Sequence, residues 1–447
     1  MVSTALLAVA GIAISSVAQA REVPERPNIV PSPIQPFKPF PTSAPRTKSC
    51  FVKPSCTPGR DDAPKILAAI EECNNGGTVV LDKEYTICSP LDLRFLKNID
   101  IALTGTVKFC EDIEKWVPTF FNFPFQDQGT WWLWGGEDIN LYGAGTGTID
   151  GNGQVWYDAH ATSNVQRPLL FVTDGWVGGS ITGLKLRNSP QARKPYMSRY
   201  IGWHNLIANS SDLLISDIDI YSRSTSEHEA KNLDGWDTYR SDNIVIQNSH
   251  IEHDDDCVSF KPNSTNIVVQ GLFCNSSHGI SVGSLAQYPG VFDVIENLYI
   301  YNNTLSNATD SARIKIWAGE HAVTKPGWIG GGGTGHVLNV TYENFHVNGN
   351  DAALKIDQCY GSVNASTCKE NPSQMIIEDV VFKNFWGTTS KNGDPVVGSL
   401  ICSDDQSCRN VRAENVNVST PSRKTPQWQV RFIDKELLDV VGDIVDG

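Results

Sequence analysis

The sequence predicts an all-β protein built as a parallel β-helix, a solenoid of short strands around one continuous core. Three observations lead to this fold class. An Asn or Asp followed by strand-forming residues recurs throughout the chain, successive copies from Asp212 onward lie 23 to 42 residues apart, and no helical periodicity separates them. In a solenoid each coil contacts only its neighbours, so a chain of this length can form one domain.

The copies of this motif alternate apolar and polar residues, which places every second side chain inside the solenoid and the others outside. They begin at Asp212, Asn243, Asn266, Asn297, Asn339, Asp379 and Asn410, with fainter copies at Asn98 and Asp138. The recurring Asn residues should stack as a ladder at one corner, where their side chains satisfy backbone groups of the turns. An antiparallel sandwich is the alternative, but hairpin signals such as Asn-Gly are sparse between the copies.

The N-terminal part of the chain differs from the repeats. Residues 1–20 carry no charge, are mostly apolar and end in an A-x-A-like site, which predicts a secretory signal peptide cut after Ala20. Residues 21–47 are rich in proline and should form an extended lead-in. A short amphipathic helix is expected within residues 64–76, where it can cap the first coil of a β-helix domain that spans residues 48–435.

Eight N-x-S/T sequons and eleven cysteines favour a secreted, extracellular, glycosylated product with disulfide bonds. The candidate glycosylation sites are Asn209, Asn263, Asn275, Asn302, Asn307, Asn339, Asn364 and Asn417. The closely spaced disulfide candidates are Cys257 and Cys274, Cys359 and Cys368, and Cys402 and Cys408. The odd number of cysteines leaves at least one thiol unpaired, and no C-x-x-C spacing indicates zinc.

The formal net charge of −14 argues against nucleic acid and anionic membranes as partners. After the leader no apolar run approaches the length of a membrane span, so we expect a soluble protein and, further, a monomer. No cofactor and no metal are expected.

An unusual run of three aspartates, centred on Asp255, predicts the functional site. Asp234 precedes Asp255 by 21 residues and His278 follows it by 23, both close to the shortest coil. Arg313 and Lys315 come one longer coil further along, and residues two apart on a strand share a face. The spacing therefore predicts a column of carboxylates, an imidazole and two cations on one outer wall.

The stretches NLDG, DDC, HGISVGS and RIK, in this order and spacing, resemble the four motifs of the family 28 glycoside hydrolases, the polygalacturonases. The resemblance extends over roughly residues 50–430, and the amino-acid sequence around the motifs is most similar to that of the fungal exopolygalacturonases. Three departures stand out. Leu233 replaces the Thr of NTDG, His253 and Asp254 precede the aspartate pair, and Ala286 replaces the Gly of SLG. Leu233 and Ala286 could reshape the pocket, but all the catalytic side chains are kept.

Glycoside hydrolysis needs one protonated and one ionised carboxyl group, and crowding of carboxylates raises the pKa of one of them. The resemblance implies that Asp255 is the general acid, that Asp234 and Asp256 hold the nucleophilic water as general base, and that His278 tunes the protonation of the acid. Strict alternation would send Asp255 and Asp256 to opposite faces of a strand, so a turn or a bulge is expected there.

The resemblance also implies that Arg313 and Lys315 bind a carboxylate of a pectic substrate. We therefore expect a right-handed parallel β-helix that hydrolyses α-1,4-galacturonosyl bonds of homogalacturonan (pectin) with inversion, from the non-reducing end, and releases galacturonic acid. Lengthened coils at residues 186–211 and 317–337 could close one end of the substrate groove.

Three other functions are open to a chain of this kind. The first is a rhamnogalacturonan or xylogalacturonan hydrolase of the same family, whose members share the catalytic set and differ in the loops around the groove. The second is a pectate lyase, which shares the fold but needs calcium. The third is a non-catalytic carbohydrate-binding β-helix, for which the conjunction of carboxylates, imidazole and cations would have no purpose.

Overall fold

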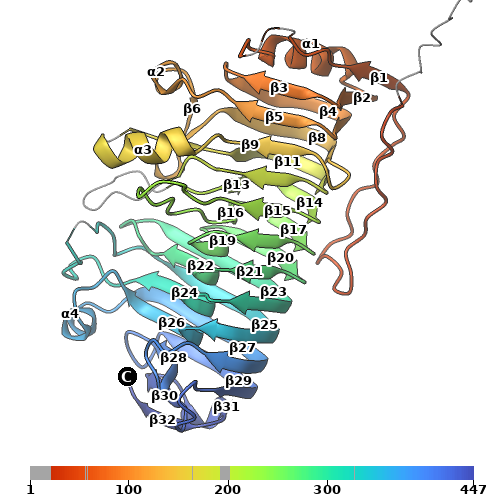
Figure 1. The fold of residues 1–447 in the computed structure, drawn as a ribbon. Coiled ribbons are helices and arrows are strands. Elements are labelled where there is room, and N and C mark those ends of the chain that lie inside the picture. Colours follow the sequence, from red (N-terminus) through yellow and green to blue (C-terminus); the bar gives the residue numbers. More distant parts are fainter. Residues whose placement is uncertain (1–21, 56, 58, 164, 192–201, 327) are drawn as a thin grey trace, which may run out of the picture.

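The computed structural model describes residues 22–447 except 56, 58, 164, 192–201 and 327. The predicted signal peptide, residues 1–20, therefore lies outside the described residues. The chain winds into a long right-handed parallel β-helix, as predicted, with its coils stacked in sequence order from α1 at one end to β32 at the other (Figure 1).

The coils align their strands in three columns, and the pairings within these columns are parallel. The first column contains the starts of β4 (Leu91–Leu103), β8 (Trp132–Tyr142) and β11 (Phe171–Thr182), then β13 (Asn205–Ala208), β16 (Trp236–Tyr239), β19 (Asp256–Phe260), β22 (Gly279–Leu285), β24 (Asp310–Trp317), β26 (Ala352–Tyr360), β28 (Val396–Ile401), β30 (Gln427–Arg431) and β32 (Asp443–Asp446). Pairing in this column continues past residue 435, where the sequence-based domain boundary was placed.

The second and third columns complete each coil. The second contains β1 (Lys48–Phe51), β2 (Gly77–Leu81), the ends of β4, β8 and β11, then β14 (Ser211–Ser216), β17 (Asp242–Gln247), β20 (Ser264–Gln270), the starts of β23 (Phe292–Ser306), β25 (Thr334–Asn350), β27 (Gln374–Thr389) and β29 (Cys408–Ser419), and β31 (Leu438–Val440). The third contains β3 (Glu84–Ile87), β5 (Thr106–Phe109), β9 (Thr148–Asp150), β12 (Lys185–Arg187), β15 (Asp219–Tyr221), β18 (His250–Glu252), β21 (Phe273–Asn275) and the ends of β23, β25, β27 and β29.

Among the described residues, a small second sheet and six short helices lie outside these columns. The sheet is made of β6 (Phe121–Phe123), β7 (Gln128–Thr130) and β10 (Pro168–Leu169). The helices are α1 (Ala63–Cys73), α2 (Ile113–Trp116), η1 (Phe125–Asp127), α3 (Gln154–Thr162), α4 (Ala365–Glu370) and η2 (Lys435–Leu437).

The core is a stack of apolar side chains that repeat from coil to coil. Ile215, Ile246, Val269 and Ile300 are cross-strand partners on successive coils, and each is fully buried. Burying a branched aliphatic side chain of this kind stabilises a protein by about 1.5–3 kcal/mol. The strict inward alternation of the repeats therefore supplies the driving force for the solenoid.

The predicted asparagine ladder is confirmed. Asn243 donates to Asp212 (2.6 Å), Asn297 donates to Asn266 (2.9 Å) and Asn339 donates to Asn297 (2.7 Å). The ladder residues have φ between 55° and 57°. Asn and Asp tolerate this left-handed conformation better than other residues with side chains, which explains why each repeat begins with one of them.

The helix expected within residues 64–76 is α1, which caps the first coil. Its residues Ile66 and Ile70 are buried in the core, and a disulfide joins Cys73 to Cys50. The three predicted disulfide candidates also form bonds: Cys257–Cys274, Cys359–Cys368 and Cys402–Cys408. Within the described residues Cys88 and Cys110 are free thiols, while Cys56 lies outside them.

The proline-rich segment is extended, as expected, but it also packs along the outside of the solenoid. Figure 1 shows residues 22–47 running down beside the coils and back up to β1. Ile34 exchanges backbone hydrogen bonds with the side chain of Gln270, and its side chain packs on Val245 and its neighbours. The backbone N–H of Lys38 donates to Asn243, and Arg46 pairs with Asp100 at 2.9 Å. The segment therefore covers an apolar strip on the second column.

In the part of the chain that the structure describes, no helix has the length and apolar character that a membrane crossing requires.

Candidate active site

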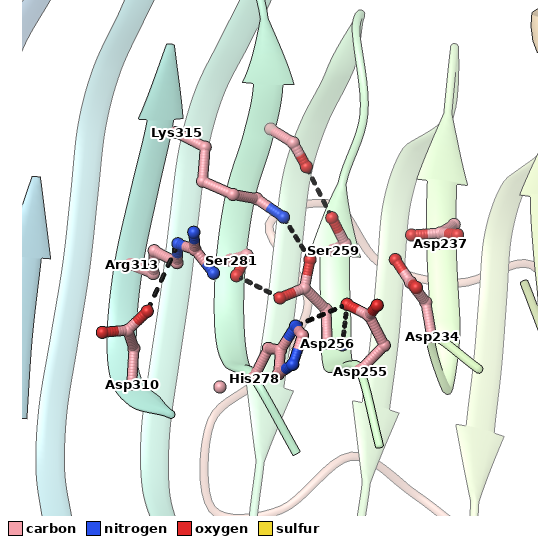
Figure 2. Close-up of polar contacts among 12 residues, drawn as sticks. Asp234, Asp237, Asp255, Asp256, Ser259, His278, Ser281, Asp310, Arg313 and Lys315 are labelled. Carbon is pink, nitrogen blue, oxygen red and sulfur yellow. Dashed lines mark hydrogen bonds and ion pairs between the residues drawn. The ribbon is translucent and has the colours of Figure 1, made fainter. Parts of the chain in front are cut away.

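The first strand column brings the predicted site residues onto one outer wall. Asp237 on β16 is the cross-strand partner of Ser259 on β19, Ser259 pairs with Ser281 on β22, and Ser281 pairs with Arg313 on β24. Arg313 and Lys315 share a face, as expected (Figure 2). The column predicted from repeat spacing is therefore present.

The aspartate run enters the wall at a register irregularity. Asp255 precedes β19, Asp256 is its first residue, and the pairing of β19 with β22 shifts register between Asp256 and Val258. The backbone N–H of Asp256 donates to the Asp255 carboxylate at 2.8 Å. The expected irregularity is confirmed, and it lets both carboxylates point toward the same side (Figure 2).

Asp256 is fully buried and held by two donors. Its Oδ2 lies 2.5 Å from Lys315 Nζ, and its Oδ1 accepts a hydrogen bond of 2.7 Å from Ser281 Oγ. Burial is the largest effect and raises the pKa of Asp256, but the cations Lys315, Lys261 and Arg313 together lower that pKa below the ordinary range. This carboxylate is therefore ionised.

Asp255 forms an ion pair with His278. His278 Nδ1 lies 3.0 Å from Asp255 Oδ1, and Asn232 donates to the other carboxylate oxygen at 3.2 Å. Burial opposes the charge on both groups, but their mutual attraction dominates, so the pKa of Asp255 is lowered and that of His278 is raised. The raised carboxyl pKa expected from crowding therefore does not fall on Asp255.

The raised pKa values belong to Asp234 and Asp237. Burial is the main cause for both, and the neighbouring carboxylates add to it for Asp234; the pKa of Asp237 rises to about 7. Asp254, the extra member of the run, lies 2.6 Å from Lys231, and burial raises its pKa to about 6.

A cation that the sequence analysis did not single out lies among these carboxylates. Lys261 Nζ lies 3.3 Å from Asp234 Oδ2 and 3.2 Å from Asp237 Oδ1. A signal for it exists in the sequence, because the alternation of β19 places Ser259 and the residue two positions later on the same outward face.

The two predicted substrate-binding cations are less free than expected. Arg313 Nε lies 3.3 Å from Asp310, and Lys315 is only 6% exposed because it contacts Asp256. The ring of Tyr360 lies 5.7 Å from the Arg313 guanidinium and 5.9 Å from the Lys315 ammonium. Each cation thus has a carboxylate partner within the protein.

The outer wall becomes apolar at one end of this column. Leu206 on β13 is the cross-strand partner of Asp237, and Val172 on β11 is the partner of Leu206, so the wall is apolar on the two coils before Asp237. A buried cluster covers these coils. Its members are Phe123, Leu133, Leu169, Val172, Trp203, Leu206 and Ala208, with Phe121, Phe125 and Tyr239 packed against it.

The segment that covers the apolar coils comes from β6 and η1. The ring of Phe125 stacks on Tyr239 with centroids 3.8 Å apart and lies 5.8 Å from the ring of Trp203. Beside it, Gln126 donates a hydrogen bond of 2.9 Å to Gln287, which follows β22. We call residues 121–127 the covering segment. It was not predicted, although its aromatic run, FFNFPF from Phe120, breaks the repeat pattern.

The two lengthened coils place some of their aromatic residues near the site. Residues 192–201 of the stretch 186–211 lie outside the described residues, but Trp203 belongs to the cluster under the covering segment. In the stretch 317–337, the rings of Trp317 and Trp328 pack with that of Tyr360 at 5.5 and 5.1 Å. These aromatic side chains therefore lie beside Arg313 and Lys315.

Two of the three sequence departures at the motifs, Leu233 and Ala286, lie in defined surroundings. Leu233 is fully buried and packs with Tyr157 and Ala230. Ala286 adopts a φ of 59°, and its backbone N–H donates to Asp293 at 2.8 Å. A residue with a side chain in this conformation is uncommon, which explains why glycine suits the same position in the related motif.

Asp255, Asp256 and His278 have donor atoms within 4.8 Å of one another, a separation that a metal ion could bridge. The protein's own cations already occupy these carboxylates, since His278 contacts Asp255 and Lys315 contacts Asp256. The geometry therefore suits acid–base chemistry.

Comparisons with known proteins agree with this arrangement. Residues 83–437 match the model of the glycosyl hydrolases family 28. The chain is 60% identical over 423 residues to exopolygalacturonase X-2 of Emericella nidulans, a match that covers 94% of this chain and 92% of that protein. It is 49% identical over 411 residues to the probable exopolygalacturonase X of Neosartorya fischeri, covering 91% and 92% of the two chains.

Solved structures share the fold. The endo-xylogalacturonan hydrolase of Aspergillus tubingensis superposes with a TM-score of 0.77 and 31% identity, covering 89% of this chain and 99% of that one. The polygalacturonase of Erwinia carotovora ssp. carotovora superposes with a TM-score of 0.58 and 20% identity, covering 90% of this chain and 99% of that one.

Proposed function

The chain belongs to glycosyl hydrolase family 28, and from this premise we propose that it is a secreted exopolygalacturonase. It hydrolyses α-1,4-galacturonosyl bonds of homogalacturonan from the non-reducing end, inverts the anomeric centre and releases galacturonic acid. The 60% identity to an exopolygalacturonase over most of both chains supports this activity. The family match and the two relatives leave the lyase and the non-catalytic binding module without support.

The observation that carries exo action is the covering segment. A polymer can lie across a groove and be cut internally only if the groove is open at both ends. Here the wall before Asp237 is apolar, and the aromatic rings of residues 121–127 cover it up to Tyr239. A charged galacturonate chain has no place under these rings, so the substrate ends at the coil of Asp234 and Asp237.

In the proposed mechanism, the proton for the leaving oxygen is shared between Asp255 and His278. In the free protein it resides on the imidazole, because the pKa of His278 is raised and that of Asp255 is lowered. Moving this proton across the 3.0 Å contact yields the protonated Asp255 that a general acid requires. The glycosidic oxygen takes the proton from Asp255 as the bond to the anomeric carbon breaks.

The water that attacks the anomeric carbon is held by Asp234 and Asp256. Asp256 is ionised and fixed in place by Lys315 and Ser281, one donor to each oxygen, and its remaining lone pairs accept a hydrogen bond from the water. Asp234 lies on the preceding coil, beside Asp255 in Figure 2, and takes the proton of the water as general base. Attack from the face opposite to the leaving group inverts the centre.

Arg313 and Lys315 bind the carboxylate of the galacturonate unit. Each is paired in the free protein, to Asp310 and Asp256 respectively, so each is held in a fixed position before substrate arrives. Tyr360 lies beside both cations and limits the space above them.

Digestion of oligogalacturonates of defined length tests the proposal. Galacturonic acid should be the only product at the earliest time points, with little early fall in the viscosity of polygalacturonate, and the Asp255→Asn variant serves as the inactive control. A rapid viscosity fall with dimers and trimers appearing first would contradict exo action. Because a solved relative is a xylogalacturonan hydrolase, xylogalacturonan and rhamnogalacturonan belong in the same assay. If the enzyme releases sugar faster from either of them than from homogalacturonan, that polymer is the preferred substrate.

A further inference from the structure

Lys261 is a buried cation inside the carboxylate cluster. It follows β19, is 6% exposed, and its ammonium group lies 3.3 Å from Asp234 and 3.2 Å from Asp237. The same group donates to Ser259 Oγ at 2.9 Å and to the backbone oxygen of Gly283 at 3.4 Å. The ring of Trp203 lies 5.0 Å from it.

A lysine in this position has a large desolvation cost, because a compact ammonium ion is strongly hydrated in water. Four contacts with oxygen atoms and one aromatic face replace that hydration shell. Such a site fixes the ammonium group in one place and makes it the cation that serves two carboxylates at once. One of these, Asp234, is the base of the proposed reaction.

We propose that Lys261 and Asp237 are positioning residues that hold the Asp234 carboxylate toward the attacking water and set its ionisation in opposite directions, Lys261 favouring the charged form and Asp237 the protonated form. This inference rests on the proposed function, since it gives Asp234 the role of base. Lys261 stabilises the charge on Asp234, and Asp237 opposes that charge by competing for the same ammonium group.

The charged groups that face Asp234 come from its own coil and from the next one. Asp237 lies on the same strand segment, Asp255 and Asp256 lie on the next coil, and Lys261 follows β19. His253 is buried nearby, with its Nε2 3.0 Å from the place that a side chain on Gly235 would occupy. In the described structure Lys261 is thus the cation in ion-pair contact with Asp234, and it favours the ionised form of Asp234. The carboxylates of Asp237, Asp255 and Asp256 have the opposite effect and raise the pKa of Asp234.

The two positioning residues should therefore move the acidic limb of the activity profile in opposite directions. Asp234 must be ionised to act as a base, so activity falls as the pH drops through its pKa. Removal of Lys261 raises this pKa, and removal of the Asp237 charge lowers it. A residue needed only for packing would not produce opposite shifts.

The experiment compares kcat against pH on a defined oligogalacturonate for the wild type, Lys261→Met, Asp237→Asn and the double variant. Lys261→Met should move the acidic limb upward by at least about one pH unit and lower the maximal kcat by about tenfold or more. Asp237→Asn should move the limb downward, and the double variant should return it toward the wild-type position. Lys383→Met, which removes a half-exposed lysine paired with Glu343 on another strand column, should keep the wild-type profile.

Thermal melts establish that each variant is folded at the assay temperature. If Lys261→Met does not fold, Asp237→Asn and the double variant still test the positioning role, because the direction in which the acidic limb of each kcat–pH profile shifts can be measured. Unchanged limbs, or limbs that move in the same direction, would overturn the positioning role while leaving hydrolysis by the wild type intact. A wild-type protein that releases no galacturonic acid would instead refute the proposed function.

Discussion

In the proposed mechanism, two residues together hold the proton that glycoside cleavage requires. Asp255 and His278 are 3.0 Å apart and have pKa values displaced in opposite directions, so the imidazole stores the proton until a leaving oxygen arrives. The apparent titration of such a pair belongs to both groups and not to either one. This explains how an aspartate with a lowered pKa can serve as a general acid.

Asp255→Asn should abolish turnover and leave the fold intact, because the amide keeps the shape of the side chain but cannot deliver the proton. The loss in kcat should be at least about 10²-fold, as is usual for removal of a general acid. Steady-state assays on oligogalacturonate, with circular dichroism to establish folding, measure both. Asp254→Asn is the matched control, since Asp254 pairs with Lys231 at the side of the site. An inactive Asp254→Asn with an active Asp255→Asn would exchange the two roles.

The raised pKa of His278 predicts an alkaline limb in both activity and stability. The His278–Asp255 pair contributes fully to stability below the unfolded histidine pKa of about 6.5, and this contribution is lost as the pH rises through the higher folded pKa. Activity should decline over the same window, because the stored proton is lost. His278→Asn should have low activity, and its activity profile should lack the alkaline limb. Above pH 6, its Tm should change less with pH than the Tm of the wild type. An alkaline limb identical to that of the wild type would show that another group causes it.

Sequence spacing predicted which residues meet on the wall, because strand repeats set the position of every outward residue. It did not predict how these residues share charge. The burial of Lys315 against Asp256 and the insertion of Lys261 between two carboxylates depend on side-chain packing within the wall, which no spacing encodes. The pKa order of Asp234 and Asp255 follows from the same contacts, so it could not be predicted either.

Among the elements, the repeated ones were predictable and the inserted ones were not. Each strand column and the asparagine ladder follow from residues that recur with the coils, such as Asn243, Asn297 and Asn339. The covering segment and the proline-rich segment occur once and pack on parts of the chain that are far away in sequence. Ile34 lies beside Gln270, and Gln126 lies beside Gln287, contacts that a periodic pattern cannot indicate.

The covering segment should control the mode of cleavage. In the double variant Phe123→Ala/Phe125→Ala, the stack on Tyr239 and part of the buried cluster are lost, which opens the wall beyond Asp237. We expect dimers and trimers to appear among the early products, and the viscosity of polygalacturonate to fall faster for the same number of bonds cut. Chromatography of early digests and viscometry measure these effects.

Phe292→Ala is the control for this prediction, because Phe292 on β23 is 59% exposed and does not belong to the cluster. Its products should match those of the wild type. If the covering-segment variant still releases only galacturonic acid while its melting temperature falls, the segment stabilises the fold without setting the mode of cleavage.

At the scale of the whole molecule, charge is distributed unevenly. The net charge of −14 would repel an anionic polymer at long range, but in physiological salt charges are screened beyond about 8–10 Å. Close to the site, carboxylates and cations are paired: Lys261 contacts Asp234 and Asp237, His278 contacts Asp255, Lys315 contacts Asp256, and Arg313 contacts Asp310. The solenoid therefore presents a locally balanced site on an acidic surface, bounded on one side by an apolar wall.

In the proposed reaction, one sugar at a time is released from a chain end by an inverting attack. Proton NMR of the first product formed from homogalacturonan tests the mode of cleavage and the stereochemistry together. An α-linked substrate attacked from the opposite face yields β-galacturonic acid, so the β-anomer of the monomer should appear first and the α-anomer should grow only by mutarotation. An initial α-anomer, or first products longer than one unit, would contradict the account.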